Sequence, residues 1–190
     1  KLTIERAALL KALSHTQSVV ERRNTIPILS NVKLTAKAGR LSLDATDLDL
    51  EIVEQADCQS SVDGATTVAA HTLYDIVRKL PEGSQIELDT GGETERMSLR
   101  AGRSRFTLTC LPVEDFPVMS EGDLPHQFRL AAGDLRSLID RTRFAISTEE
   151  TRYYLNGIYL HAAVHDGVDV LRAVATDGHR LASVEVPLPE

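Results

Sequence analysis

Apolar and polar residues follow one another in this chain with a period that changes several times. Residues 1–4 predict a short strand, and apolar residues then recur at helical spacing from Glu5 to Val20. After Pro27 they fall at every second position, which is the period of a strand with one buried face. The first part of the chain therefore predicts a strand, a helix and three more strands, the last three at 28–36, 41–45 and 47–56.

The same order of elements recurs further along. Residues 66–70 predict a strand and residues 71–80 a helix with one apolar face. The sequence Pro-Glu-Gly at 81–83 ends that helix, because proline cannot continue a helix and glycine commonly follows its end. Three strands are then predicted at 85–88, 96–100 and 105–110.

A third copy of the order follows a connector that contains several prolines. A strand is predicted at 127–130 and a helix at 134–147. Three strands are then predicted at 158–160, at 168–174 and from Leu181 onward.

Individual residues support an internal repeat. Apolar residues of the first copy have apolar counterparts 126 residues later, and Ala-Thr-Asp at 45–47 returns 130 residues later at 175–177. A spacing that is preserved across several elements is the signature of a repeat. The apolar pairs are Leu9 and Leu135, Leu13 and Ile139, Val20 and Ile146, Leu29 and Leu155, Val32 and Ile158, and Leu34 and Leu160.

The repeat predicts an α+β fold built of β-α-β-β-β units. Two units at 1–120 would complete one domain, 121–126 would be a connector, and 127–190 would be the first half of a second domain. At the same period the second domain would end at about residue 250. Half a domain would expose an apolar helix face and a sheet edge. We therefore predict that this sequence is a fragment of a longer protein.

Composition narrows the class of protein. The net charge of −7 argues against tight binding of nucleic acid through overall charge. No run of about 18 apolar residues and no secretory signal are present. Cys58 and Cys110 lie in strand-like stretches without metal-ligand spacing, so we expect buried thiols in a reducing compartment. These features predict a soluble, cytoplasmic protein that does not contact a membrane and has neither metal nor cofactor.

The most distinctive stretch is Arg-Tyr-Tyr-Leu-Asn-Gly at 152–157, together with Ala-Thr-Asp-Gly-His-Arg-Leu-Ala at 175–182. If the strands between them pair as a hairpin with a third strand, five residues converge on a small apolar notch with a positively charged rim. Exposed tyrosine and arginine together are typical of recognition surfaces. The alternative is an ordinary hairpin with Asp177-Gly178 as its turn. The five converging residues are Arg152, Leu155, His179, Arg180 and Leu181.

Two other classes of function remain open at this point. A hydrolase or metal enzyme could use Asp177 and His179 with Asp47 or His161, since a carboxylate near a histidine can orient it. The chain has no nucleophile elbow, HExxH, P-loop or dinucleotide glycine motif, however. In the first copy, Ala-Thr-Asp is followed by Leu48 and by no histidine. This difference favours a structural turn that is common to both copies, with a pocket added in only one of them. The second alternative is a sugar- or peptide-binding β-rich module that does not bind DNA.

Several motifs resemble one family, the bacterial replicative sliding clamp, which is the β subunit of DNA polymerase III. The resemblance spans almost the whole chain in the correct order, and the stretches at 152–157 and 175–182 are its most specific parts. The other motifs are Thr-Ile-Pro-Ile-Leu at 25–29, Ala-Thr-Asp-Leu at 45–48, Leu-Pro-Glu-Gly at 80–83, Gly-Arg-Ser-Arg-Phe at 102–106 and Asp-Phe-Pro at 115–117.

The resemblance implies a DNA-clamp fold with helices on the inner face and antiparallel sheets outside. Three domains per subunit and two subunits would close a homodimeric ring around double-stranded DNA, which is bound without sequence preference. The function would be that of a processivity factor, a non-catalytic accessory subunit of a DNA-directed DNA polymerase holoenzyme. Its partners would be the replicative polymerase, the clamp loader and repair proteins, which bind through short linear motifs.

Charge distribution agrees with this expectation. A closed ring holds DNA topologically, so an acidic chain needs positive charge only where it faces the DNA. Acidic residues gather in the strands and turns around Asp44–Asp57. Positive residues gather on the predicted helices and at their ends: Arg6, Lys11, Arg22, Arg23, Arg78, Lys79, Arg136, Arg141 and Arg143.

Two sets of site residues are expected. Arg23, Tyr153 and Tyr154 match DNA contacts of the family, and Arg78 and Lys79 are added for their charge. A tyrosine can stack on a base or accompany a phosphate, although packing of Tyr154 under the sheet is equally open. The partner-peptide pocket would comprise Arg152, Leu155, Thr176, Gly178, His179, Arg180 and Leu181.

In this pocket the leucines would receive an apolar anchor, and the arginines would hold acidic or carbonyl groups. The rest of its wall would come from sequence beyond residue 190. We therefore expect this chain to bind such peptides weakly.

Overall fold

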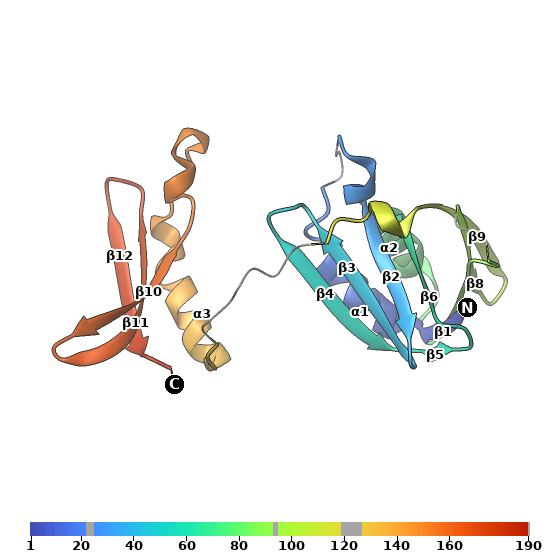
Figure 1. The fold of residues 1–190 in the computed structure, drawn as a ribbon, viewed down its shortest axis with the longest axis horizontal. Coiled ribbons are helices and arrows are strands. Elements are labelled where there is room, and N and C mark those ends of the chain that lie inside the picture. The colour runs from blue at the N-terminus through green and yellow to red at the C-terminus, as the bar shows by residue number, and fades with distance from the viewer. Residues whose placement is uncertain (22–24, 93–94, 119–126, 190) are drawn as a thin grey trace. The chain divides into compact units, whose positions relative to one another are not determined.

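The structure is a computed structural model that describes residues 1–21, 25–92, 95–118 and 127–189. The chain divides into two compact units, Lys1–Ser120 and Glu121–Glu190. We call them unit 1 and unit 2 and describe each by itself (Figure 1). In the described part of the chain, no helix is long and apolar enough to span a membrane.

Unit 1 contains the predicted order of elements twice. The first copy comprises β1 (Leu2–Glu5), α1 (Arg6–Thr16), the 3-10 helix η1 (Pro27–Ser30), β2 (Asn31–Lys37), β3 (Arg40–Thr46) and β4 (Glu51–Asp57). The second copy comprises β6 (Gly64–Ala69), α2 (Ala70–Lys79), β7 (Gln85–Asp89), β8 (Arg96–Ala101) and β9 (Ser104–Leu111). A short strand, β5 (Gln59–Ser60), lies between the copies, and the 3-10 helix η2 (Val113–Asp115) follows β9.

Helix α1 is shorter than predicted. The Glu5 side chain accepts a hydrogen bond from the Ala8 amide (3.1 Å) at its start, and the helix ends at Thr16 rather than at Val20. Just after its end, the Ser18 hydroxyl donates to the His15 carbonyl (2.6 Å), a local bond that competes with helix continuation. Val20 is still buried, which explains why the apolar pattern extends past the helix.

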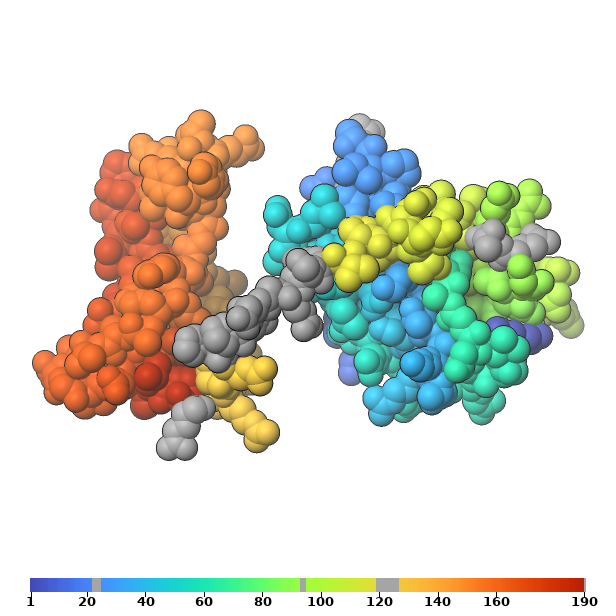
Figure 2. Space-filling model, in the orientation of Figure 1, coloured from blue at the N-terminus to red at the C-terminus, as the bar shows by residue number. Residues whose placement is uncertain are grey.

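The predicted strand at 28–36 begins later, because residues 27–30 form η1. Pro27 stands at its first position, where a missing amide hydrogen costs nothing. Ile28 and Leu29 are buried against Phe116, and in Figure 2 the segment around η2 (yellow) lies against the segment around η1 (blue). Residues 47–50, also predicted as strand, form a turn before β4.

The strands of unit 1 form one antiparallel sheet in the order β4-β3-β2-β6-β9-β8-β7-β1-β5. Each copy lends its first strand to the other copy. Strand β1 pairs with β7, with Ile4 opposite Ile86, and β6 pairs with β2, with Val68 opposite Val32. This exchange ties the two copies into one body, so neither can keep its sheet without the other.

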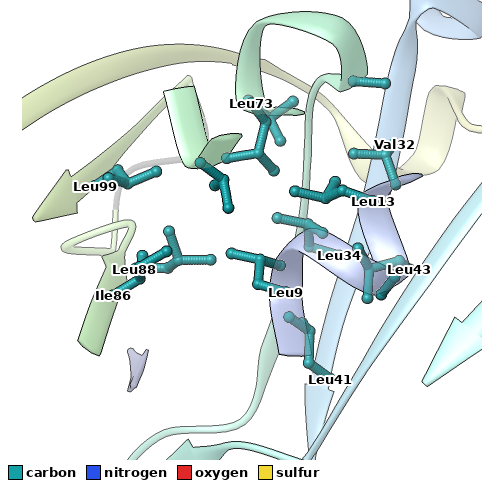
Figure 3. Packing of buried hydrophobic residues seen from close by; sticks show 14 of the residues in the cluster. Leu9, Leu13, Val32, Leu34, Leu41, Leu43, Leu73, Ile86, Leu88 and Leu99 are labelled. Atoms are coloured by element: carbon teal, nitrogen blue, oxygen red, sulfur yellow. The ribbon is translucent and has the colours of Figure 1, made fainter. Parts of the chain in front are cut away.

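Helices α1 and α2 pack against each other and against the sheet, around one apolar core. Figure 3 shows Leu9 and Leu13 of α1 and Leu73 of α2 directed at side chains from the strands. Burial of each such side chain contributes about 1.5–3 kcal/mol. The strand residues labelled there are Val32, Leu34, Leu41, Leu43, Ile86, Leu88 and Leu99, all of them buried.

The described part of unit 2 contains the helix and the last three strands of the order once. Its elements are α3 (Ala132–Asp140), the 3-10 helices η3 (Arg143–Ala145) and η4 (Glu150–Leu155), and the strands β10 (Tyr159–His165), β11 (Val168–Thr176) and β12 (Leu181–Pro187). The strands form an antiparallel sheet in the order β10-β11-β12. Leu138 of α3 packs on Leu171, Ala173 and Val184 of this sheet.

Two predictions for unit 2 are wrong. Residues 127–130 form no strand, because their counterpart β1 is held by β7 and β5, and the described part of unit 2 contains no corresponding strands. The helix predicted at 134–147 ends at Asp140. There the Thr142 hydroxyl donates to the Leu138 carbonyl (2.6 Å), and η3 continues the chain instead.

Cys110 is buried as predicted, whereas Cys58 is only half-buried; both thiols are free.

Candidate functional site

The turn between β11 and β12 is held by two of its own side chains. The Asp177 carboxylate accepts hydrogen bonds from the amides of His179 and Arg180, both at 2.9 Å. The Thr176 hydroxyl accepts from the Gly178 amide (3.1 Å) and donates to the Arg180 carbonyl (2.7 Å). The Arg180 and His179 amides, together with the Arg180 guanidinium, lower the pKa of Asp177 to about 2. The carboxylate is therefore used to build the turn, which weakens the case for Asp177 as a catalytic partner of His179.

Gly178 allows η4 to approach this turn closely. Its φ of +89° is rare for residues with a side chain. A Cβ atom at this position would lie 3.3 Å from Nη1 of Arg152. Two segments that are distant in sequence, η4 and the turn, are thus brought into contact, and Arg152 meets the turn that carries Arg180.

Both arginines of the notch are paired with acids. Nε of Arg152 lies 2.9 Å from Glu149, and Nε of Arg180 lies 2.9 Å from Asp177. The two pairs together carry no net charge, so the positive rim expected from the sequence is balanced within the notch itself. The sequence contains the signal for both pairs, since in each case the acid precedes its arginine by three residues.

The remaining pocket residues lie around these pairs. Leu155 ends η4 and is half-buried, whereas Leu181 begins β12 and is 65% exposed. His179 is exposed at the tip of the turn. An exposed leucine beside hydrogen-bond donors is a surface onto which an apolar group of a partner can pack.

Tyr153 and Tyr154 both point to solvent. They are 79% and 71% exposed, with their rings 5.8 Å apart edge to face. Packing of Tyr154 under the sheet, the alternative considered from the sequence, is therefore wrong.

The positive residues on the helices differ in whether other groups of the chain already bind them. Arg6 donates from Nε and Nη2 to the carbonyls of Val77 and Arg78, and so satisfies the C-terminal end of α2. Arg78 itself pairs with Asp75 at 3.1 Å, whereas Lys79 and Lys11 are exposed. Arg23, expected to contact DNA, lies outside the described residues, as does Arg22.

Around α3 and the segment that follows it, positive residues are likewise either paired with an acid or exposed. Arg136 and Arg143 both pair with Asp140, at 3.2 and 3.5 Å, and Arg141 is exposed. Phe144 belongs to none of the motifs that the sequence marks, yet its ring centroid lies 5.6 Å from the guanidinium carbon of Arg180. A contact between residues 36 positions apart leaves no local signal in the sequence.

In the described ranges, no three His, Cys, Asp or Glu side chains gather as metal ligands could.

Comparison with known proteins agrees with the repeat and its fold. Residues 1–120 match the family described as DNA polymerase III beta subunit, N-terminal domain, and residues 129–190 match the central domain of the same family. The fold of this chain, with antiparallel sheets and packed helices, is that of the sliding clamps. The chain belongs to the DNA polymerase III beta subunit family.

Similar proteins span more residues than this chain. The beta sliding clamp of Caulobacter vibrioides (strain NA1000 / CB15N) is 60% identical over 190 residues, covering 100% of this chain and 51% of that protein. The beta sliding clamp of Escherichia coli (strain K12) is 42% identical over 189 residues, covering 99% of this chain and 50% of that protein. The chain thus spans about half the length of the relatives it matches.

Solved structures give the same result. The beta sliding clamp of C. crescentus matches with a TM-score of 0.97 at 60% identity, covering 100% of this chain and 50% of the other. The sliding clamp of Bartonella birtlesii, solved bound to griselimycin, matches with a TM-score of 0.93 at 53% identity, covering 100% and 50%. The predicted clamp fold is confirmed.

Proposed function

We propose that this chain is the N-terminal half of a processivity factor that encircles duplex DNA and tethers the replicative polymerase. The observation that carries the proposal is the strand exchange of unit 1, which presents α1 and α2 as a pair. Lys11 and Lys79 are exposed on these helices and can approach phosphates without reading sequence. Arg23, Arg78, Tyr153 and Tyr154 are the further DNA contacts that we propose.

Unit 2 is proposed to be half of a second clamp domain. Leu9 and Leu13 of α1 are fully buried in unit 1, whereas their counterparts Leu135 and Ile139 are 42% and 41% exposed on α3. A second copy of the repeat, placed as α2 is placed in unit 1, would cover them. The domain boundaries at residue 120 and near residue 127 follow from this proposal.

Ring closure through a second subunit is supported by a free strand edge. Strand β9 pairs with β8 along most of its length, but with β6 only at Cys110 and Leu111. The other edge of its earlier residues, which include Phe106, is unpaired among the described strands. A strand of another subunit can add to such an edge. We propose that the intact subunit forms a homodimer in this way.

The notch is proposed to receive short linear motifs of polymerase, clamp loader and repair proteins. Leu155 and Leu181 would contact an apolar anchor, and Arg152 and Arg180 would donate to carbonyl or carboxylate groups of the peptide. Thr176, Gly178 and His179 would shape the turn around it. Griselimycin, bound to a related clamp in its crystal structure, is a compound that we propose binds the intact subunit of this protein as well. The intact protein would act in the cytoplasm and would not itself be catalytic.

The topological part of the proposal is tested on circular DNA. The intact subunit, loaded on a nicked plasmid, should be retained in high salt and released when the plasmid is cut, because it would slide off the ends. Retention that is the same on circular and linear DNA would contradict encirclement, and would favour a direct binding module instead.

The peptide-binding part is tested separately. In the intact subunit, Leu155→Ala with Arg180→Ala should abolish binding of a polymerase peptide in calorimetry and leave ring retention on circular DNA unchanged. Unchanged peptide affinity would refute the notch as the partner site, without bearing on encirclement.

A further inference from the structure

Phe144 is an exposed aromatic side chain beside the notch. It is the middle residue of η3, its side chain is 57% exposed, and it belongs to neither apolar cluster of the described part of unit 2. Single exposed hydrophobic residues are common and by themselves indicate nothing. Phe144 differs because the Arg180 guanidinium carbon lies 5.6 Å from its ring centroid, within the range of a cation–π contact.

The first and third copies of the repeat show that the turn does not need this contact. In unit 1, Asp47 accepts from the amides of Asp49 and Leu50, and Thr46 accepts from the amide of Leu48, as Asp177 and Thr176 do in unit 2. At the offset of the repeat, Ser18 stands in place of Phe144 and Leu50 in place of Arg180. The aromatic ring and the guanidinium are thus present together in the copy that has the notch, and absent together from the other.

The guanidinium of Arg180 is restrained on two sides. Asp177 holds its Nε at 2.9 Å, and the ring centroid of Phe144 lies 5.6 Å from its guanidinium carbon. Within the described part of the chain, its two Nη groups make no hydrogen bond or ion pair. Because Asp177 cancels the charge of Arg180, the arginine offers a partner oriented donors rather than net charge.

We propose that Phe144 is a positioning residue of the notch, whose ring fixes the guanidinium plane of Arg180 so that both Nη groups face an acceptor on a bound peptide. This inference rests on the proposed peptide-binding function of the notch. The group recognised is a carboxylate or carbonyl of the peptide, next to an apolar side chain that packs on Leu181. A donor that is already oriented loses less rotamer freedom on binding, which is the source of the gain in affinity.

The first measurement needs no ligand. In the 190-residue chain, Phe144→Leu should move the Nε–H resonance of Arg180 in the NMR spectrum, because the ring-current shift is lost, and should speed exchange of that proton with water. Phe144→Tyr keeps an aromatic face and should restore both properties. An Arg180 resonance that is unchanged in Phe144→Leu would overturn the inference.

The second measurement uses a defined probe, the acetylated hexapeptide Thr-Asp-Leu-Asp-Leu-Glu, titrated into the intact subunit while the Leu181 methyl signals are followed. Phe144→Leu should weaken binding about two- to fivefold, the range of an exposed cation–π contact. Phe144→Tyr should bind like the unsubstituted subunit. In an Arg180→Ala background, Phe144→Leu should have no further effect, because the ring acts through the arginine.

The outcomes separate the inference from the function on which it rests. An equal loss in both backgrounds means that the ring acts on the peptide or the fold directly, which overturns the positioning role. Binding that is insensitive to Phe144→Leu refutes the inference alone. No binding by the unsubstituted intact subunit refutes the peptide-binding function, and the inference with it.

Discussion

Helices α1 and α3 occupy the same place in two copies of one repeat, yet their apolar faces differ in burial. Leu9 and Leu13 are fully buried in unit 1, while Leu135 and Ile139 are more than two-fifths exposed in unit 2. The difference lies in the neighbours: α1 packs on α2 of the exchanged copy, and the described part of unit 2 contains no second copy. The repeat encodes its own elements but needs a second copy to bury them.

The duplicated turns show a second difference. Both are held by a Thr hydroxyl and an Asp carboxylate, and both place a residue at positive φ: Leu48 at +84° and Gly178 at +89°. A leucine in this conformation is strained, yet unit 1 keeps one with its side chain 50% exposed. In unit 2 the glycine leaves room for Arg152, whose Nη1 lies 3.3 Å from where a Cβ would stand. The turn is shared, and the close approach of Arg152 is the feature added in unit 2.

The largest effect is expected from truncating a counterpart pair in the two helices. Leu13→Ala should destabilise unit 1 by about 2–5 kcal/mol, because it leaves a cavity in a closed core. Ile139→Ala should cost unit 2 less than about 1 kcal/mol, since the side chain is partly in water already. Urea unfolding, followed through NMR signals that belong to each unit, measures both.

The same pair sharpens the comparison in the intact subunit. There Ile139→Ala should cost as much as Leu13→Ala, because the following copy of the repeat would bury it. Equal costs of the two substitutions in the 190-residue chain would show that Ile139 is already buried in solution, and would break the comparison between α1 and α3.

The next effect concerns Gly178. Gly178→Leu copies the residue of unit 1 into unit 2, and should destabilise unit 2 by about 1–3 kcal/mol, because it places a side chain at positive φ. It should also displace Arg152, whose signals in the NMR spectrum would shift together with those of Glu149. An Arg152 that keeps its signals would show that the close approach does not depend on glycine.

The sequence predicted the order of elements well, because each has its own period: two for the strands and 3.6 for the helices. The prediction failed where the hydrogen bonds of a side chain, rather than the spacing of apolar residues, determine the local structure. The strand expected at 47–56 starts only at Glu51, since Asp47 takes up the amides that a strand would pair. It failed also at 127–130, where strand formation depends on partners far along the chain.

The candidate site was predictable in part. Its residues stand in two conspicuous motifs, and the repeat offset predicts that Asp177 holds a turn as Asp47 does. The spacing of three residues between Glu149 and Arg152 was visible in the sequence, but the 3-10 helix η4 that carries Arg152 was not predicted. The contact of Phe144 with Arg180 depends on the packing of η3 near the turn, which no local pattern encodes.

A smaller effect of opposite sign is expected in unit 1. Leu48→Gly removes a strained side chain that is half in water, and should stabilise unit 1 by about 0.5–1 kcal/mol: relief of the strain outweighs the greater freedom of glycine in the unfolded chain. Thermal unfolding of Leu48→Gly, with Leu50→Gly as the control at the neighbouring exposed leucine, measures the difference. Destabilisation by Leu48→Gly would show that Leu48 contributes packing that its exposure does not indicate.

The smallest effect is expected from the titration of Asp177. Its pKa of about 2 in the folded chain lies below the ordinary value of 3.8, because the amides of Arg180 and His179 and the Arg180 guanidinium favour the carboxylate. The folded state therefore binds this proton more weakly than the unfolded chain does. The resulting stability is complete above pH 3.8 and is lost as the pH falls through about 2.

Asp177→Asn has no carboxyl to protonate, so unit 2 of this variant should lose less stability than the unsubstituted chain over the same acidic range. The carboxyl carbon of Asp177, followed by NMR, should titrate near pH 2 in the unsubstituted chain. Arg180→Ala should raise that pKa only in part, because the two amides remain in the turn. If Arg180→Ala instead restored the ordinary pKa, the ion pair rather than the backbone amides would stabilise the carboxylate. The turn of unit 2 would then differ from that of unit 1 in the hydrogen bonds that hold it, as well as in its exposed residues.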